Sequence, residues 1–223
     1  MFFIKSFWRI ALYMGLYWLA GFAKALAADG PMPASPINAD DIVGWYYNAE
    51  VGASLVPSLV NSSGYKIVLK PGVRSTMAGG HSFNFMKNST LNIELEGGII
   101  YNQLESLSAG GATESMQGNI CLLPLLGNAE FCYALGPRWS VYAGAGGGLA
   151  GLFVNVDTVG GAPVGLYRSE VDGAVQALAG LRYQFTNRSE VGVGFKYLDV
   201  LSRIDGINSL RTYAIFLSFA RRF

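Results

Sequence analysis

The segment that decides the fold is the last one in the chain, Ser209-Leu-Arg-Thr-Tyr-Ala-Ile-Phe-Leu-Ser-Phe-Ala-Arg-Arg-Phe223. Its odd positions are apolar, namely Tyr213, Ile215, Leu217 and Phe219. Its even positions from 212 to 220 are small or polar, with Phe216 as the exception. A period of two predicts a β-strand with one apolar face, which at the edge of a soluble sheet would invite aggregation. A closed transmembrane barrel removes that edge, because this strand pairs with the first one.

The composition favours the same all-β architecture. Of the 223 residues, 51% are hydrophobic and 14% are charged, and the mean hydropathy is +0.31. Beyond the N-terminus, however, no run reaches the ~18 apolar residues that a membrane helix needs. Apolar residues at alternate positions are typical of a barrel whose strands each show one face to lipid. The 29 glycines suit a curved sheet better than helices, and the net charge of +1 does not indicate a nucleic-acid partner.

The N-terminal segment Met1–Ala27 is predicted to be a cleavable secretory signal peptide. Lys5 and Arg9 supply its positive start, and an apolar core follows over Ile10–Ala23. Ala25-Leu-Ala27 supplies the small-x-small pattern of a cleavage site. The alternative is an uncleaved membrane anchor. Export would place the protein in the outer membrane of a Gram-negative cell, after passage through the periplasm.

The mature chain is expected to consist of a Pro-rich periplasmic leader, residues 28–43, and a barrel, residues 44–223. Eight alternating segments predict an antiparallel up-and-down barrel: Trp45–Leu55, Ile67–Gly79, Leu91–Gln103, Gly118–Tyr133, Trp139–Phe153, Val171–Phe185, Glu190–Leu201 and Ser209–Phe223. Pro71-Gly72 predicts a bulge in the second segment, because proline cannot donate to a sheet ladder.

The connections predict the orientation of the barrel. The linkers after the fourth and sixth segments are short, whereas four others are long and polar or Gly-rich, namely Val56–Lys66, Leu104–Gln117, Asn155–Glu170 and Ser202–Asn208. Short turns on one side and long loops on the other are typical of outer-membrane barrels with both termini in the periplasm. His81–Thr90 is rather long for a periplasmic turn, and the second strand can extend into it.

The two cysteines, Cys121 and Cys132, are expected to be free thiols. On one strand they would lie roughly 36 Å apart and face opposite sides, whereas a disulfide needs Cα atoms within about 7 Å. The alternative places a hairpin turn at Leu126-Gly-Asn128, which could bring the two together.

Charged residues within the predicted strands share the inward parity. They are Glu50, Lys70, Arg74, Glu94, Glu96, Glu130, Arg182 and Lys196. The interior of an eight-stranded barrel is only wide enough for side chains to fill it, and buried charges must pair. Four acids and four bases therefore predict a nearly neutral network that closes the lumen. The alternative is a gated path for ions.

Aromatic residues are predicted to form two girdles at the membrane interfaces. The periplasmic girdle would comprise Trp45, Tyr47, Phe131, Tyr133, Trp139, Tyr183, Phe185 and Phe223. The outer girdle would comprise Tyr101, Phe153, Tyr197 and Tyr213.

The sequence contains no recognisable set of catalytic, cofactor-binding or metal-binding residues. The single histidine, His81, precedes Ser82 but is expected near the periplasmic end, away from the outer face where lipid-modifying barrels work. One histidine and two separated cysteines do not supply the ligands of a zinc site. The run Gly144-Ala-Gly-Gly-Gly148 lacks the Lys-Ser/Thr of a phosphate loop, and its inward glycines are expected to leave room for bulky lumen side chains.

From Gly44 to Phe223 the chain resembles the small bacterial outer-membrane β-barrel proteins of the OmpA/OmpX and opacity type. The motifs that carry the resemblance are Pro71-Gly-Val-Arg74, Glu94-x-Glu96-x-Gly98, Tyr142-Ala-Gly-Ala-Gly146 and the terminal Phe223. The resemblance implies insertion by the barrel assembly machinery, which recognises the last strand through Tyr213, Ile215, Leu217, Phe219 and Phe223. Arg221 departs from the family, which usually has an apolar or aromatic residue there.

The expected function is structural or one of surface display, through four extracellular loops on a monomer embedded among outer-membrane lipids, including lipopolysaccharide. A loop ligand cannot be named. A narrow, porin-like channel is the alternative, and a lipid A-modifying enzyme ranks below both.

Overall fold

The computed structural model describes residues 43–61, 63–201 and 209–223. Its strands are β1 Gly44–Leu55, β2 Leu59–Val60, β3 Lys66–Leu69, β4 Gly72–Met86, β5 Ser89–Ala109, β6 Ala112–Ala134, β7 Trp139–Val159, β8 Ala162–Gln184, β9 Ser189–Val200 and β10 Leu210–Arg222. The predicted signal peptide, most of the predicted leader and the predicted loop Ser202–Asn208 lie outside the described residues. Among the described residues, no helix is long and apolar enough to cross a membrane.

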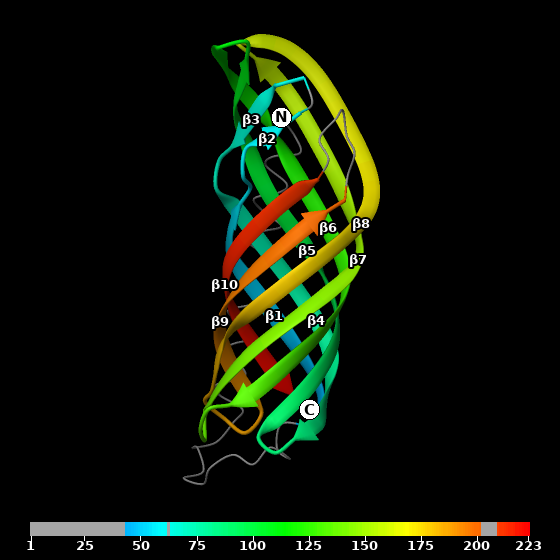
Figure 1. Cartoon of the computed structure of the whole chain (residues 1–223), viewed down its shortest axis with the longest axis vertical. Helices are drawn as coiled ribbons and strands as arrows, with labels where there is room; N and C mark the ends of the chain where they lie inside the picture. The colour runs from blue at the N-terminus through cyan, green and yellow to red at the C-terminus, as the bar shows by residue number, and fades with distance from the viewer. Residues whose placement is uncertain (1–42, 62, 202–208) are drawn as a thin grey trace.

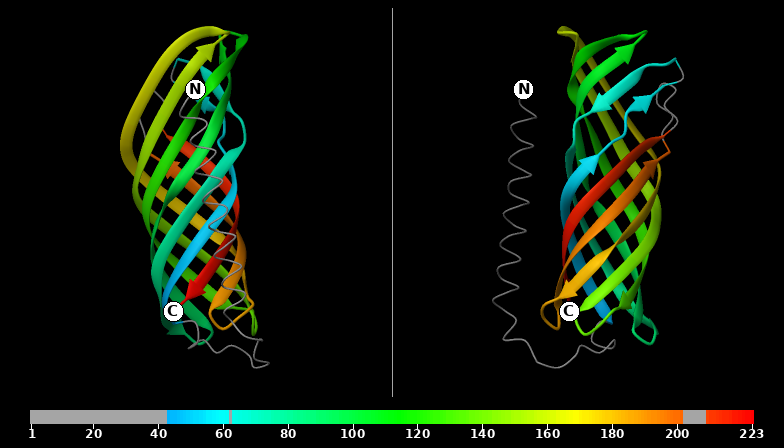
Figure 2. Two further views of the ribbon diagram at one scale, coloured as in Figure 1. Left: turned by 180° about the vertical axis from the view of Figure 1, so that it is seen from behind. Right: turned by 60° about the vertical axis from the view of Figure 1, so that its left-hand side comes forward.

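Eight of the described strands close into a ring. Antiparallel pairing runs in the order β5, β4, β1, β10, β9, β8, β7 and β6, and β6 pairs again with β5. β10 is joined to β1 from Tyr46↔Arg222 to Leu55↔Tyr213, as its alternating pattern predicts. Figures 1 and 2 show the resulting cylinder, whose strands are tilted from its long axis, with the red β10 beside the blue β1. The predicted antiparallel barrel of eight strands is therefore the observed fold.

The two ends of the cylinder differ, and we name them by their connections. The turn end carries the C-terminus and the short β4–β5, β6–β7 and β8–β9 turns, at the bottom of Figure 1. The hairpin end carries the extended β5–β6 and β7–β8 hairpins and the small β2–β3 hairpin. β4 runs on to Met86, so the predicted extension of the second strand toward residue 90 is confirmed.

The two long hairpins replace the loops expected at Leu104–Gln117 and Asn155–Glu170. Each closes on a glycine pair, Gly110-Gly111 with φ of 56° and 86°, and Gly160-Gly161 with φ of 58° and 83°. Two consecutive positive φ values are typical of the type I′ turn, which matches the twist of the flanking strands. The strands therefore continue well beyond the cylinder on this side.

A bulge separates β3 from β4 at Lys70-Pro71, where the sequence predicts one. The pairing with β5 passes from Leu69↔Leu104 to Val73↔Tyr101, so the segment that joins β3 to β4 has one residue more than β5 over this interval. One extra residue reverses the side to which the following side chains point. Lys70 is exposed as a result, and its predicted place in the lumen is wrong.

β6 carries a buried proline in the middle of the wall. Pro124 pairs with Ala150 of β7, but the pairing of β5 with β6 lapses between Leu122 and Leu125. Proline has no N–H to donate, which accounts for a gap in one ladder of a continuous strand. β6 otherwise runs unbroken, so the alternative hairpin at residues 126–128 is excluded.

Candidate functional site: the barrel interior

Lys196 of β9 occupies the centre of a buried charge cluster in the middle of the lumen. Its Nζ lies 2.6 Å from Oε2 of Glu50 on β1 and 2.8 Å from Oε2 of Glu96 on β5. Arg74 of β4 donates from Nη2 to Oε1 of the same Glu96. These four side chains come from four strands and are almost inaccessible to solvent. The cluster therefore ties opposite walls of the cylinder together.

Neutral amides complete the hydrogen bonding of these carboxylates. Nδ2 of Asn128 donates to Glu94 at 2.9 Å and to Glu96 at 2.8 Å. Nε2 of Gln176 donates to Glu96 at 2.8 Å, while its Oε1 accepts from Arg74 at 3.0 Å. A carboxylate buried away from water needs such donors as well as a counter-ion. Glu96 thus receives bonds from two cations and two amides.

A second group of ion pairs closes the turn end of the lumen. Nη2 of Arg182 lies 2.6 Å from Oε2 of Glu130, and its Nε lies 3.7 Å from Oε1 of Glu190. Arg222 binds the other oxygen of Glu190 at 3.1 Å. The Arg182 guanidinium also stacks 3.9 Å from the centroid of the Tyr142 ring. The lumen network predicted from the sequence included Arg182 and Glu130 but did not include the other two members of these ion pairs, Glu190 and Arg222.

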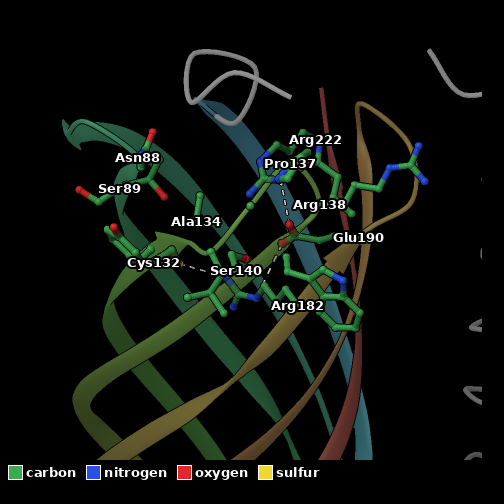
Figure 3. Close-up of a pocket in the computed structure, with 16 residues that line it drawn as sticks. Asn88, Ser89, Cys132, Ala134, Pro137, Arg138, Ser140, Arg182, Glu190 and Arg222 are labelled. Atoms are coloured by element: carbon green, nitrogen blue, oxygen red, sulfur yellow. Dashed lines mark hydrogen bonds and ion pairs between the residues drawn. The ribbon is translucent and has the colours of Figure 1, made fainter. Parts of the chain in front are cut away.

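Figure 3 shows three members of this group, Arg182, Glu190 and Arg222, lining an open vestibule of about 360 Å³. Arg138 and Ser140 contribute to its wall, and Asn88 lies across from them on the β4–β5 turn. Cys132 lies at its base, where Sγ accepts from Asn92 at 3.3 Å. The vestibule is therefore the accessible part of the lumen at the turn end.

Glycines on the inner wall make room for the polar groups. A Cβ on Gly146 of β7 would fall 1.9 Å from Oδ1 of Asn128, and one on Gly180 of β8 would fall 2.5 Å from the Tyr142 hydroxyl. Both distances are far shorter than van der Waals contact. The glycine run in β7 therefore serves the packing of the interior, as expected, although the side chain it accommodates is Asn128.

Above the charge cluster, toward the hairpin end, an apolar layer fills the lumen. Leu126 and Leu198 are both 0% exposed, and Ile100 is 1% exposed. Leu126 pairs with Glu96, and Leu198 pairs with Gln176, so the layer lies directly beside the cluster. Such close-packed aliphatic side chains leave little room for water. The interior is thus filled by two tiers of different chemistry.

The outer wall of the cylinder is apolar along its middle. Large exposed side chains there include Val51, Met77, Leu95, Leu125, Leu149, Val193 and Ile215. They alternate along their strands with the buried residues of the lumen, as the period of two predicts. Such a broad exposed apolar surface is exceptional for a soluble monomer.

Aromatic side chains lie on this outer wall near both ends. At the turn end, Trp139 packs on Tyr183 with ring centroids 4.8 Å apart, and Tyr47 packs on Phe223 at 5.8 Å. Trp45, Phe131, Tyr133 and Phe185 belong to strand ends or turns on the same side. Nearer the hairpin end, Tyr197 of β9 packs on Tyr213 of β10 at 5.3 Å, and Tyr101 and Phe153 lie on β5 and β7, the two neighbours of β6.

The remaining candidates for chemistry are kept apart. His81 lies on the outer wall, with its ring centroid 5.1 Å from that of Trp45 and 4.5 Å from that of Phe83, whereas Ser82 is buried on the other side of β4. Cys121 is half-buried and Cys132 is buried, and both thiols are free, as expected. The structure therefore assembles neither a histidine–serine pair here nor a disulfide.

Comparison with known proteins adds evidence on the fold. A scan against protein-family models and a search of curated protein sequences both gave no match. Among solved structures, the chain is similar to Neisserial surface protein A (NspA), with 15% identity, a TM-score of 0.53, and coverage of 81% of this chain and 97% of that one. It is also similar to the outer membrane protein OprG from Pseudomonas aeruginosa, with 12% identity, a TM-score of 0.54, and coverage of 81% and 97%. The closed ring of strands, the apolar outer wall and the similar solved structures all indicate the same architecture. The chain has the fold of the small outer-membrane β-barrel proteins.

Proposed function

We propose that this protein is a non-conducting outer-membrane barrel that displays β-hairpins at the cell surface. The proposed location is supported by the apolar middle of the outer wall and by the fold. The aromatic groups at the two ends would then form the interfacial girdles, where amphipathic rings are favoured. The turn end, with its short connections and the C-terminus, would face the periplasm, and the hairpin end would face outward.

The filled lumen is the observation that carries this proposal. An ion crossing the cylinder would have to pass both the buried cluster around Lys196 and the aliphatic layer at Leu126 and Leu198. Opening the cluster would strand charges at a cost of several kcal/mol, and the aliphatic layer offers no polar groups to replace the hydration of an ion. A rigid closed cylinder is suited to anchoring surface structures, whereas a channel needs an open path.

The proposal includes partners that the barrel would need for insertion. The outward residues Tyr213, Ile215, Leu217, Phe219 and Phe223 of the last strand would be read by the barrel assembly machinery. The embedded wall would contact outer-membrane lipids, including lipopolysaccharide at the outer leaflet. The β2–β3, β5–β6 and β7–β8 hairpins, together with the β9–β10 connection, would meet any extracellular partner. Since the lumen holds no serine–histidine arrangement among the described residues, we propose no enzymatic role.

Conductance and surface labelling test the two halves of the proposal. In planar lipid bilayers the folded protein should give no steady channels, and reproducible open channels would contradict the closed lumen. An epitope inserted between Gly110 and Gly111 should be labelled by antibody on intact cells. The matched control carries the same epitope between Pro137 and Arg138, in the β6–β7 turn, and should be labelled only after permeabilisation. The reverse pattern would contradict the orientation.

A further inference from the structure

A cavity of about 280 Å³ opens at the hairpin end, above the aliphatic layer of the lumen. Leu59 and Ile67 of the β2–β3 hairpin close one side, and Leu104, Met116 and Leu152 form part of the facing wall on β5, β6 and β7. These residues are buried or half-buried although they lie beyond the charge cluster. We call this space the outer cavity.

The lining of the outer cavity is aliphatic except near its rim. Val154 and Val156 of β7 pair with Arg168 and Leu166 of β8, and residues paired across strands point to the same face. Arg168 thus points to the same side as Val154 and lines the cavity with it. It is the one charged residue among the described residues of the lining. The structure shows no ion pair between its guanidinium and any described residue. Arg168 and Tyr65 are both exposed, which places them on the solvent side of the cavity, and Asn61 is the remaining polar residue of the lining.

The floor of the outer cavity is closed. Leu152 and Leu104 belong to the same buried aliphatic group as Leu126 and Leu198, which separate the cavity from the charge cluster. A molecule that enters from the hairpin end therefore reaches a dead end inside the barrel. The arrangement can hold a ligand, but it offers no continuation toward the turn end.

We propose that the outer cavity binds a single-chain anionic amphiphile of the fatty-acid class. The alkyl chain would lie among the aliphatic side chains, where burial of apolar surface is favourable. The carboxylate would receive charge-assisted hydrogen bonds from Arg168 at the rim. Ligand pockets commonly measure ~300–1,000 Å³, so this cavity suits one chain rather than a two-chain lipid. The inference goes beyond the display role, since it concerns a site for a small molecule.

Methionine-methyl NMR of the folded barrel in phosphatidylcholine nanodiscs tests the proposal with internal controls. Met116 lines the cavity, whereas Met77 is exposed on the outer wall and Met86 is exposed at the turn end of β4. Titration with the twelve-carbon fatty acid laurate should shift the Met116 signal saturably. Nonspecific partition into the bilayer would instead shift Met77 or Met86 without saturation, and such a result with an unmoved Met116 would overturn the proposal.

Two pairs of variants separate the head-group contact from the tail contact. Arg168→Gln should weaken laurate binding by about tenfold or more, the usual range for losing a hydrogen bond to a charged group, and should leave binding of dodecanol nearly unchanged. Val156→Trp, which fills the cavity, should abolish the Met116 shift, whereas Leu149→Trp on the outer face of the same strand should preserve it.

Three outcomes would contradict the assignment. Equal affinity for laurate and dodecanol, unaffected by Arg168→Gln, would overturn the anionic head group. A Met116 shift that survives Val156→Trp would show that laurate binds elsewhere. The Met116 signal should also be compared between the protein in a lipid-free amphipol and in the nanodisc. If this signal shifts on transfer to the nanodisc and then does not respond to laurate, the occupant of the cavity is a bilayer lipid and not the free amphiphile.

Discussion

Replacing Lys196 by methionine should destabilise the barrel more than any change to a surface charge. Methionine keeps most of the length and the apolar stem of lysine but removes the ammonium group that lies within 2.8 Å of both Glu50 and Glu96. Breaking a buried ion pair by removing one partner typically costs ~3–5 kcal/mol, because the remaining charge is left uncompensated. Here two carboxylates lose their shared cation. We therefore expect a loss of about 3–5 kcal/mol in the free energy of unfolding, or roughly a hundred- to a few-thousand-fold in the equilibrium constant.

The assay is urea unfolding of the barrel in phospholipid vesicles, followed by the fluorescence of Trp45 and Trp139. Arg211→Met is the matched control, since Arg211 pairs with Asp199 at 3.4 Å but is 58% exposed. Exposed pairs contribute ~0–1 kcal/mol.

Adding a second substitution distinguishes the electrostatic explanation from a packing defect. Glu50→Gln in the Lys196→Met background removes one stranded carboxylate and should restore part of the lost stability, so the two effects should not add. A packing defect would leave the two effects additive. If Lys196→Met costs no more than Arg211→Met, the reasoning about the buried cluster is refuted.

Three further predictions concern other parts of the barrel. Gly146→Ala should lower the free energy of unfolding by about 1–3 kcal/mol, because its Cβ would collide with the side-chain amide of Asn128, which joins two glutamates. In the same urea assay Gly147→Ala should be close to neutral, because the nearest atom to its Cβ would be 3.6 Å away. Mass spectrometry under non-reducing conditions should find both cysteine thiols free. A water-soluble maleimide should react with the buried Cys132 only after the barrel is unfolded. A disulfide between Cys121 and Cys132 would contradict the register of β6. Phe223→Ser should slow membrane insertion in vivo while leaving refolding into detergent intact, and an equal loss in both would assign Phe223 a structural role only.

The alternation of side chains made most of the wall predictable from the sequence. Because the period of a strand is two, parity alone places Glu50, Glu96 and Lys196 on one face and Ile215 and Leu217 on the other. Closure of the ring then brings residues far apart in the chain together. The pairing of a particular lysine with a particular glutamate depends on register and tilt, which parity does not specify.

The sequence predictions that the structure corrects failed for local physical reasons. Lys70 has inward parity in the sequence, but the bulge beside Pro71 moves it to the outside. Glu190 and Arg222 were missed because they lie at strand ends, where a pattern of two or three residues is too short to read. The glycine pairs at 110–111 and 160–161 were a readable signal of type I′ hairpins, and they would have corrected the predicted loops.

The outer cavity could not be foreseen for a different reason. Where a strand is apolar on both faces, as at Leu122-Leu-Pro-Leu-Leu126, periodicity does not distinguish a lipid-facing wall from a buried layer. The sequence therefore predicted a charge network that closes the lumen, without an apolar layer beside it. The structure places the charges in the middle and at the turn end, and aliphatic side chains above them.

The proline in the wall of β6 gives the cylinder one seam that is weaker than the others. Across Pro124 the neighbouring strand β5 loses its regular partners at Gly98 and Ile99, although every strand remains in place. Spontaneous openings of the barrel should therefore begin between β5 and β6. Of the Gly98 and Ile99 amides, the one that faces β6 rather than β4 should take up deuterium faster than its neighbours in β5. A barrel whose lumen is filled can therefore still open locally through its wall, toward the lipid, where this ladder is interrupted.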